Sequence, residues 1–542
     1  MEWKPQVNQA GYLPHERKRF HVEASQASFE VVHADSGEPV WRGTTSPAHF
    51  DAASGVNVSA GDFTEVREPG RYRIRIANGE ETEVAIGEDC YHELHQALLR
   101  AFYFLRCGTE LTEPFAGPWT HAACHQTPAK VYGREELREV NGGWHDAGDY
   151  GKYTVAAAVA VADLLLAYEL NPAAFAKPLP LPETGLTGGM PDVLHECRYE
   201  LEFLLKMQDE DGGAFHKVTT YHFCGLDVMP EEDTAPLVLS PVSSTATGDL
   251  AAILALAARL YQPWDEAFAA RCLSAAEAAW AWLVRHPEGL LFHNPPEVST
   301  GEYGDVSDLD ERYWAAAELY RTTGQALYHD EVKRLVQQGG FDLCELGWAA
   351  VGGYGTIAYL LMERSQTEPR LRETLRTAWL ARADELLAIA EADGYGVALQ
   401  ADKYGWGSNM NVLNHAQHLL IASLEGRDIR YRQAALEQLH YLLGRNVLGQ
   451  SYVTGIGSVP LRNPHYRPGV GDGIEEAVPG MVSGGPNPGL HDEYSREHLA
   501  GRAPAASFAD HEDSYATNEI TIYWNSPAVF VTSFFVSFPT KL

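Results

Sequence analysis

The sequence predicts a two-domain protein, with a small β-sandwich in residues 1–88 and an all-α domain in residues 89–542. Two observations support this division. Apolar residues recur with a period of two in the first segment, as in strands, and with a helical period after Cys90. In addition, a chain of 542 residues is too long for one ordinary domain.

The first segment reads as a series of short strands. From residue 71 to residue 76, arginine alternates with an apolar residue, so one face of this strand is apolar. The run ends at Asn78–Gly79, a hairpin-turn signal, and an extended pattern resumes over residues 82–86. Such strands and turns over about 85 residues indicate a β-sandwich of immunoglobulin type.

About twelve helices are predicted after Cys90, many of them too rich in alanine and leucine to be isolated surface helices. Their expected ranges are 91–107, 151–169, 189–208, 245–262, 265–285, 308–323, 327–338, 353–366, 370–392, 407–424, 428–444 and 517–534. Six helical hairpins closed into an (α/α)6 barrel would account for this number. An open helical array would show the same periodicity.

The longest connections between these helices hold the most distinctive residues. They are rich in glycine, proline, aromatic residues, histidine and acids, and they cover residues 108–150, 209–244, 286–307 and 445–516. Long loops on a rigid base often carry function. We therefore expect a substrate site in these loops.

Composition excludes several classes of partner. The formal charge of −33 would repel a phosphate backbone, and no run approaches the roughly 20 apolar residues of a membrane span. We therefore expect no nucleic-acid or membrane partner. We also expect a monomer.

The seven cysteines are too sparse for a disulfide scaffold. The N-terminus lacks a basic and apolar signal, which predicts a cytoplasmic protein; a secreted protein whose signal was removed is the alternative.

Three acids are candidates for catalysis. Asp146 and Asp149 lie three residues apart in a glycine-rich loop, where the backbone can approach a ligand closely. Glu519 is expected at the start of the last helix, where apolar neighbours could raise its pKa. Glycosidic hydrolysis needs one acid and one base, although acids with these spacings are more often solvated or cap helices.

At these residues the sequence resembles glycoside hydrolase family 9, the family of inverting cellulases. One signature runs Phe508–x–Asp510–x4–Tyr515–x3–Glu519–x–Thr521–x3–Asn525–Ser526, and a second runs Ser451–x–Val453–Thr454–x2–Gly457 and Pro464–His465–x–Arg467. Val459 departs from the second pattern, which expects Asn, Lys or Arg there. The segments GGWHDAGDYGKY, WGSN and GGPN are also similar to the family, and VNQAGYLP resembles the start of its immunoglobulin-like module.

The resemblance implies a role for each acid. Glu519 would be the general acid and Asp149 the general base, while Asp146 would help to hold the attacking water. An inverting site leaves roughly 6.5–9.5 Å between acid and base for that water. His465 and Arg467 match a pair that binds the sugar beside the cleaved bond.

Several aromatic residues are further candidates for sugar binding, because pyranose rings present apolar C–H faces. Packing in the core is the alternative for each of these residues. The candidates are Tyr515, Trp406, Trp524, Trp348 and Tyr303.

Two metals are predicted. Cys107, Cys124, His125 and His145 have no zinc-finger spacing, but the resemblance implies a structural zinc held by these four residues. A structural calcium is the second prediction, because Asp305, Asp308, Asp310 and Glu311 cluster as hard oxygen ligands. An acidic helix start would explain the same cluster.

The sequence thus predicts an endo-β-1,4-glucanase that hydrolyses cellulose-like β-1,4-glucans and cello-oligosaccharides with inversion. An exo-acting member of the family, such as a β-glucosidase or exo-glucosaminidase, is the alternative. A non-catalytic sugar-binding protein is disfavoured because all three acids are present. A zinc hydrolase is disfavoured because the chain has no HExxH motif.

Overall fold

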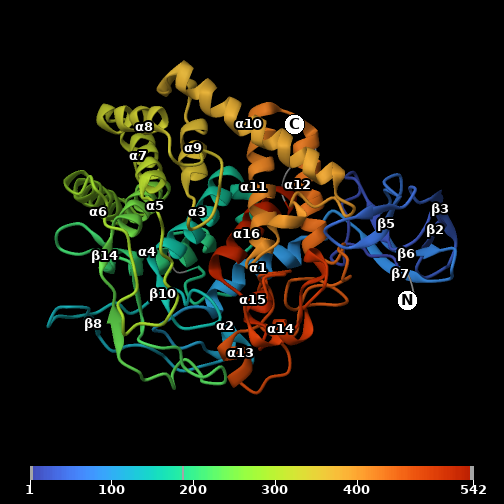
Figure 1. Cartoon of the computed structure of the whole chain (residues 1–542), viewed down its shortest axis with the longest axis horizontal. Coiled ribbons are helices and arrows are strands. Elements are labelled where there is room, and N and C mark those ends of the chain that lie inside the picture. Colours follow the sequence, from blue (N-terminus) through green and yellow to red (C-terminus); the bar gives the residue numbers. More distant parts are fainter. Residues whose placement is uncertain (1–3, 186–187, 537–542) are drawn as a thin grey trace. The chain divides into compact units, whose positions relative to one another are not determined.

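A computed structural model describes residues 4–185 and 188–536 of the chain. The chain divides into two compact units. Unit 1 comprises Met1–Ala101, Ala383–His465 and Glu475–Leu542, and unit 2 comprises Phe102–Arg382 and Tyr466–Ile474. Figure 1 shows the elements of both.

The N-terminal part of unit 1 is a sandwich of two antiparallel sheets. One sheet has the order β3-β2-β6-β7 and the other the order β1-β5-β4. The strands are β1 Arg19–Val22, β2 Ser28–His33, β3 Pro39–Thr44, β4 His49–Asp51, β5 Val56–Asp62, β6 Gly70–Ile76 and β7 Glu81–Ile86. Tyr72, Ile74 and Ile76 of β6 are buried in one core with Phe20 and Phe29, which confirms the predicted apolar face.

The rest of unit 1 is mostly helical. α11 (Ser408–Gly426) packs against α12 (Ile429–Leu442) and α16 (Ile522–Val536), and nearly every side chain of α16 is buried. The shorter elements are α14 Glu493–His498, α15 Tyr515–Asn518 and the 3-10 helices η3 Ala401–Lys403 and η4 Pro504–Ala506. Two helices, α1 His92–Phe104 and α10 Pro369–Ala392, contain residues of both units.

Unit 2 is built around α5 (Ser244–Tyr261), which packs against α3, α6 and α7. The other long helices are α3 Thr154–Leu170, α4 Asp192–Lys206, α6 Glu266–Arg285, α7 Leu309–Thr323, α8 Ala326–Gln338 and α9 Gly352–Leu360. Its short helices are α2 Glu113–Ala116, α13 Arg467–Gly471, η1 Pro172–Phe175 and η2 Arg364–Gln366.

In unit 2, short sheets form within the connections for which the sequence predicts loops. A five-stranded sheet has the order β10-β12-β13-β8-β9, and β11 pairs with β14. The strands are β8 Ala129–Val131, β9 Leu137–Arg138, β10 Lys152–Tyr153, β11 Ala214–Phe215, β12 Lys217–Thr220, β13 Leu237–Leu239 and β14 Val242–Ser243. Residues 108–150 and 209–244 are therefore partly strands.

Every predicted helix overlaps an observed one, and two of them differ from it by more than three residues at one end. The helix expected over 353–366 ends at Leu360. The helix expected over 517–534 begins at Ile522, and Glu519 lies before it with extended backbone, at φ −66 and ψ 157. No helix among the described residues is long and apolar enough to cross a membrane.

Candidate active site and metal centre

The loop that carries Asp146 and Asp149 in unit 2 is held by backbone hydrogen bonds. The Cys107 amide donates to the Gly143 carbonyl at 2.7 Å, and the His145 amide donates to the Leu105 carbonyl at 2.7 Å. Gly143 has φ +75, and a Cβ there would lie 2.6 Å from the Phe203 ring. The glycine is therefore required by both backbone conformation and space.

Asp146 is the more buried of the two acids, at 1% exposure. Its Oδ2 accepts a hydrogen bond from the Tyr303 hydroxyl at 2.6 Å, while its Oδ1 has no partner among the described residues. Burial raises the pKa of Asp146 well above its ordinary value; the Tyr303 hydrogen bond opposes this rise and the Asp149 charge adds to it. Asp149 Oδ2 accepts from the Gly151 amide at 2.9 Å.

Tyr303 is held in an unusual backbone conformation, with φ +51. Its carbonyl lies 3.0 Å from Nε2 of His216, and its ring lies 4.5 Å from that of Tyr153 and 4.8 Å from that of Trp348. Left-handed backbone is costly for a bulky residue and is often found at functional sites. The structure thus places Tyr303, a predicted sugar-stacking residue, with its hydroxyl on Asp146.

Arg467 also contacts this loop. Its Nη1 donates to the Gly148 carbonyl at 2.8 Å, and its Nη2 donates to the Cys224 carbonyl at 3.2 Å. Gly148 lies between the two acids, and Arg467 is buried. In this structure the guanidinium therefore braces the loop, a role that the sequence did not predict.

In unit 1, backbone hydrogen bonds hold the main chain of Glu519 in place. The Gly484 amide donates to the Glu519 carbonyl at 2.9 Å, and Glu519 forms a parallel bridge with His465. The His465 amide donates to the Asn518 carbonyl at 2.9 Å. Glu519 and His465 are therefore neighbours.

Aromatic rings form a surface near these residues. Tyr515 lies 5.7 Å from the His465 ring and 5.6 Å from that of Trp406, which is 45% exposed. His491, which the sequence did not single out, lies 5.8 Å from Trp406. Exposed aromatic rings of this kind can stack on sugar faces.

Trp524 differs from these rings because it is only 2% exposed. A Cβ on Gly484 would lie 2.8 Å from its ring, and one on Gly407 would lie 3.1 Å away. Trp524 therefore packs in the core, the alternative that the sequence left open for it.

The two cysteines and two histidines predicted for zinc gather in unit 2. Their ligand atoms all lie within 4.8 Å of one another, and this is the one group of three or more potential ligands found so close in the described part of the chain. Neither ring nitrogen of His125 has a hydrogen-bond partner in that part, and its backbone has φ +46. A buried two-sulfur, two-nitrogen set fits tetrahedral zinc. The residues are Cys107, Cys124, His125 and His145.

The acids predicted for calcium have other contacts. Asp308 pairs with Arg312 at 2.9 Å, and Asp310 accepts from the Val351 amide at 2.9 Å. Asp305 accepts from the amides of its own turn. Glu311 is fully buried, and neither of its carboxylate oxygens has a partner among the described residues.

Asp249 of α5 shares this condition, since it is fully buried and neither of its oxygens has a described partner. Burial raises the pKa of Glu311 well above its ordinary value, and the charges of Asp310 and Asp249 raise it further. The calcium site stays a prediction, with Asp249 as a further candidate that the sequence did not reveal.

Comparison with known proteins identifies the family. A family model described as "Glycosyl hydrolase family 9" matches residues 91–532, and one described as "Cellulase N-terminal ig-like domain" matches residues 4–81. The chain belongs to glycosyl hydrolase family 9. It is a glycoside hydrolase of the cellulase type with an N-terminal immunoglobulin-like domain.

Individual relatives agree. The chain is 39% identical to a cellodextrinase of Butyrivibrio fibrisolvens, over 97% of this chain and 98% of the relative. Among solved structures, a single mutant of a thermostable endoglucanase from Alicyclobacillus acidocaldarius is 43% identical, with a TM-score of 0.94 over 99% of this chain and 100% of that one. A zinc-binding triple mutant of endoglucanase J30 is 33% identical, with a TM-score of 0.92 over 97% and 99%.

Proposed function

We propose that this family 9 enzyme is an endo-β-1,4-glucanase that hydrolyses cellulose-like glucans and cello-oligosaccharides with inversion of configuration. The observation that carries the proposal is the family match over residues 91–532, together with the presence of all three acids of the family. The cellodextrinase relative favours soluble cello-oligosaccharides among the substrates. An exo-acting enzyme would differ in its product pattern.

Asp149 is proposed as the general base and Glu519 as the general acid. Asp149 takes a proton from a water molecule whose oxygen bonds to the anomeric carbon. Glu519 gives its proton to the glycosidic oxygen as the bond from that oxygen to the anomeric carbon breaks. One water is consumed, and the new hydroxyl lies on the face opposite to the leaving group.

Asp146 is proposed to orient the attacking water. Its Oδ2 is occupied by the Tyr303 hydroxyl, whereas its Oδ1 remains available as an acceptor. A second acceptor besides Asp149 would fix the direction of the water's lone pair. The hydroxyl of Tyr303 then fixes the carboxylate itself, which supports a positioning role for Tyr303.

Sugar contacts are proposed for His465, Tyr515 and Trp406, whose rings form one surface near Glu519 in unit 1. His491 extends this surface. Trp348 is proposed as a further sugar contact through its position beside Tyr303. Arg467 is proposed to contact the sugar beside the cleaved bond, as the family resemblance implies, and it also braces the loop of Asp146 and Asp149.

We also propose a structural zinc ion held by Cys107, Cys124, His125 and His145. These four ligands would complete a tetrahedral coordination shell, so the zinc would have no open position for catalysis. His145 precedes Asp146 directly, so the metal would anchor the catalytic loop. Asp233 Oδ2 lies 3.6 Å from His125 Nε2 and could orient that ring.

Calcium is proposed near Glu311, where a divalent ion would supply the positive charge that balances the buried carboxylates of Asp249 and Glu311.

For the helical domain, the family supports six hairpins closed into an (α/α)6 barrel. A domain boundary at residue 88 and a monomeric state complete the proposal.

The test is the variant Glu519→Gln, with Glu497→Gln as a control on an exposed helix of the same unit. We expect Glu519→Gln to lower kcat on cellotetraose by several orders of magnitude while the melting temperature stays nearly unchanged. Chromatography and NMR of the products would report the cleavage pattern and the first anomer formed. Near-normal turnover of Glu519→Gln, or retention of configuration, would refute the proposal.

A further inference from the structure

Gln9 of the immunoglobulin-like domain makes an unusual number of contacts with one distant segment of unit 1. Its amide donates to the Leu443 carbonyl at 2.9 Å, and its Nε2 donates to the Gly449 carbonyl at 2.8 Å. Its Oε1 accepts from the Val459 amide at 2.8 Å and from the Ser458 hydroxyl at 3.3 Å. One residue therefore joins both ends of the segment 443–459.

Two glycines make room for this side chain. A Cβ on Gly444 would lie 2.2 Å from Gln9 Nε2, and one on Gly457 would lie 2.6 Å from Gln9 Oε1. Both glycines also have positive φ values, of +108 and +99. The segment is thus shaped around the Gln9 amide, and a side chain at either glycine would displace it.

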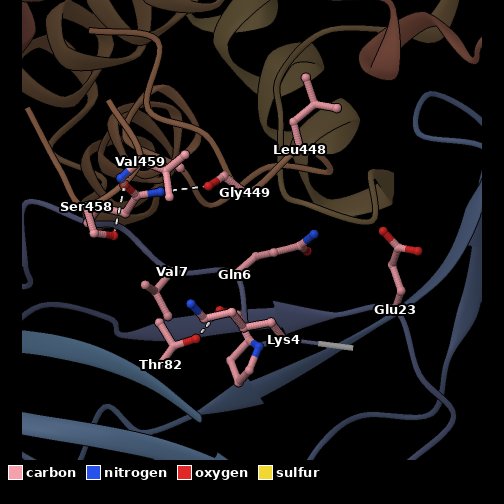
Figure 2. Close-up of a pocket in the computed structure, with 12 residues that line it drawn as sticks. Lys4, Gln6, Val7, Glu23, Thr82, Leu448, Gly449, Ser458 and Val459 are labelled. Carbon is pink, nitrogen blue, oxygen red and sulfur yellow. Dashed lines mark hydrogen bonds between the residues drawn. The ribbon is translucent and has the colours of Figure 1, made fainter. Parts of the chain in front are cut away.

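The contacts lie at a pocket lined by Gln9 and eleven other residues. Figure 2 shows Gly449, Ser458 and Val459 on one side of the pocket and Val7 and Thr82 on the other. Gln6, Gln9 and Thr82, which line the pocket, have protein partners for their side chains. Gln6, for example, donates to the Val447 carbonyl and accepts from the Tyr395 hydroxyl. Such hydrogen bonding is typical of packing between two segments of a chain and does not indicate a ligand site.

Backbone pairing connects the segment 443–459 to residues 482–484. The Ser451 amide donates to the Val459 carbonyl at 3.0 Å, which closes the segment on itself. The Ser483 amide then donates to the Tyr452 carbonyl at 3.0 Å, and Val453 bridges Val482.

The last link reaches the general acid. The residue after Ser483 is Gly484, whose amide donates to the Glu519 carbonyl at 2.9 Å, while Ser483 bridges Ile520. Every step of this path is a hydrogen bond or a bridge within unit 1. Glu519 lies in extended backbone outside any helix, and these strand-like pairings, together with its bridge to His465, hold its backbone.

We propose that Gln9 is a positioning residue for the general acid: it sets the shape of the segment 443–459, and that segment sets the backbone position of Glu519 through residues 482–484. The immunoglobulin-like domain thereby takes part in the proposed reaction without touching substrate. The inference rests on the proposed role of Glu519.

The test compares Gln9→Met, which keeps most of the volume but loses the side-chain hydrogen bonds, with Thr82→Val. Thr82 lines the same pocket, and its hydroxyl donates to the Pro5 carbonyl at 2.8 Å, outside the segment 443–459, so its variant should lower stability without changing kcat. For Gln9→Met, we expect kcat on cellotetraose to fall by about 10- to 100-fold with little change in KM, because a displacement of about 1 Å in a catalytic group has such an effect.

A substrate with a good leaving group separates positioning from a general loss of folding. Hydrolysis of 2,4-dinitrophenyl β-cellobioside needs little protonation of the leaving oxygen, so Gln9→Met should retain much more activity on it. An equal loss on both substrates, or a kcat as high as that of Thr82→Val, would overturn the inference. If Glu519→Gln itself left kcat unchanged, the proposed function would fail instead.

Discussion

The hydroxyl of Tyr303 offers the most direct test of how the Asp146 carboxylate is oriented. Tyr303→Phe removes the 2.6 Å hydrogen bond to Asp146 Oδ2 and retains the ring that packs on Tyr153 and Trp348. Both oxygens of a buried carboxylate would then lack a protein partner. We therefore expect Asp146 to lose its fixed orientation toward the attacking water.

The magnitude follows from the strength of the lost bond. A hydrogen bond to a charged group contributes about 1.5–3 kcal/mol. If most of this is realised in the transition state, kcat should fall by roughly 10- to 100-fold, since about 1.4 kcal/mol corresponds to a factor of ten. KM should change little, because the ring that could contact sugar remains.

Steady-state kinetics on cellotetraose would measure both parameters, with Tyr354→Phe as the control. The Tyr354 hydroxyl donates to Asp163 at 2.9 Å elsewhere in unit 2, so this variant also removes a tyrosine–carboxylate bond. It should lower the melting temperature and leave kcat unchanged. The reasoning is refuted if Tyr303→Phe raises KM while kcat stays within about twofold of the parent, because Tyr303 would then act on the sugar.

Three other perturbations have defined outcomes. Chelation, or Cys124→Ser, should lower the melting temperature well before it abolishes chemistry. Cys197→Ser, at a buried cysteine outside the zinc ligands, should leave the zinc content measured by mass spectrometry unchanged. A protein that binds no zinc would contradict the structural-zinc proposal. Asp393→Asn should stabilise the protein progressively as pH rises from about 4 to 7. Burial, helped by the Asp51 charge, raises the pKa of Asp393 to about 7, so the folded state binds the extra proton and the aspartate costs most above that pH. Urea unfolding at pH 8 should show a gain of at least about 1 kcal/mol, and an equal gain at pH 4 would exclude this cause. Trp406→Ala should raise KM for cello-oligosaccharides more than it lowers kcat, and an unchanged KM would remove Trp406 from the sugar contacts.

The elements of the fold could be predicted because periodicity reports burial directly. The helix expected over 265–285 is observed as Glu266–Arg285, and Asp265 caps it by accepting from the Phe268 amide. The strand over 70–76 likewise buries its apolar residues and leaves its arginines more exposed. In both cases the local pattern and the tertiary environment favour the same structure.

Glu519 shows where local pattern is insufficient. The apolar run after it predicts a helix from residue 517, yet α16 begins at Ile522. The backbone around Glu519 pairs with His465 and Gly484 instead, and helix formation would break these bonds. Those partners lie far away in the sequence, so propensity alone could not reveal the competition.

The polar residues that support the site were hidden for the same reason. The family resemblance predicts a sugar contact for Arg467, and the structure adds that its guanidinium donates to the Gly148 and Cys224 carbonyls. The sequence does not single out His216 as a site residue, yet its Nε2 lies 3.0 Å from the Tyr303 carbonyl, 87 residues away. A motif can indicate that a residue matters for the reaction. Whether it touches substrate or positions another group is decided by contacts that form only when distant segments meet.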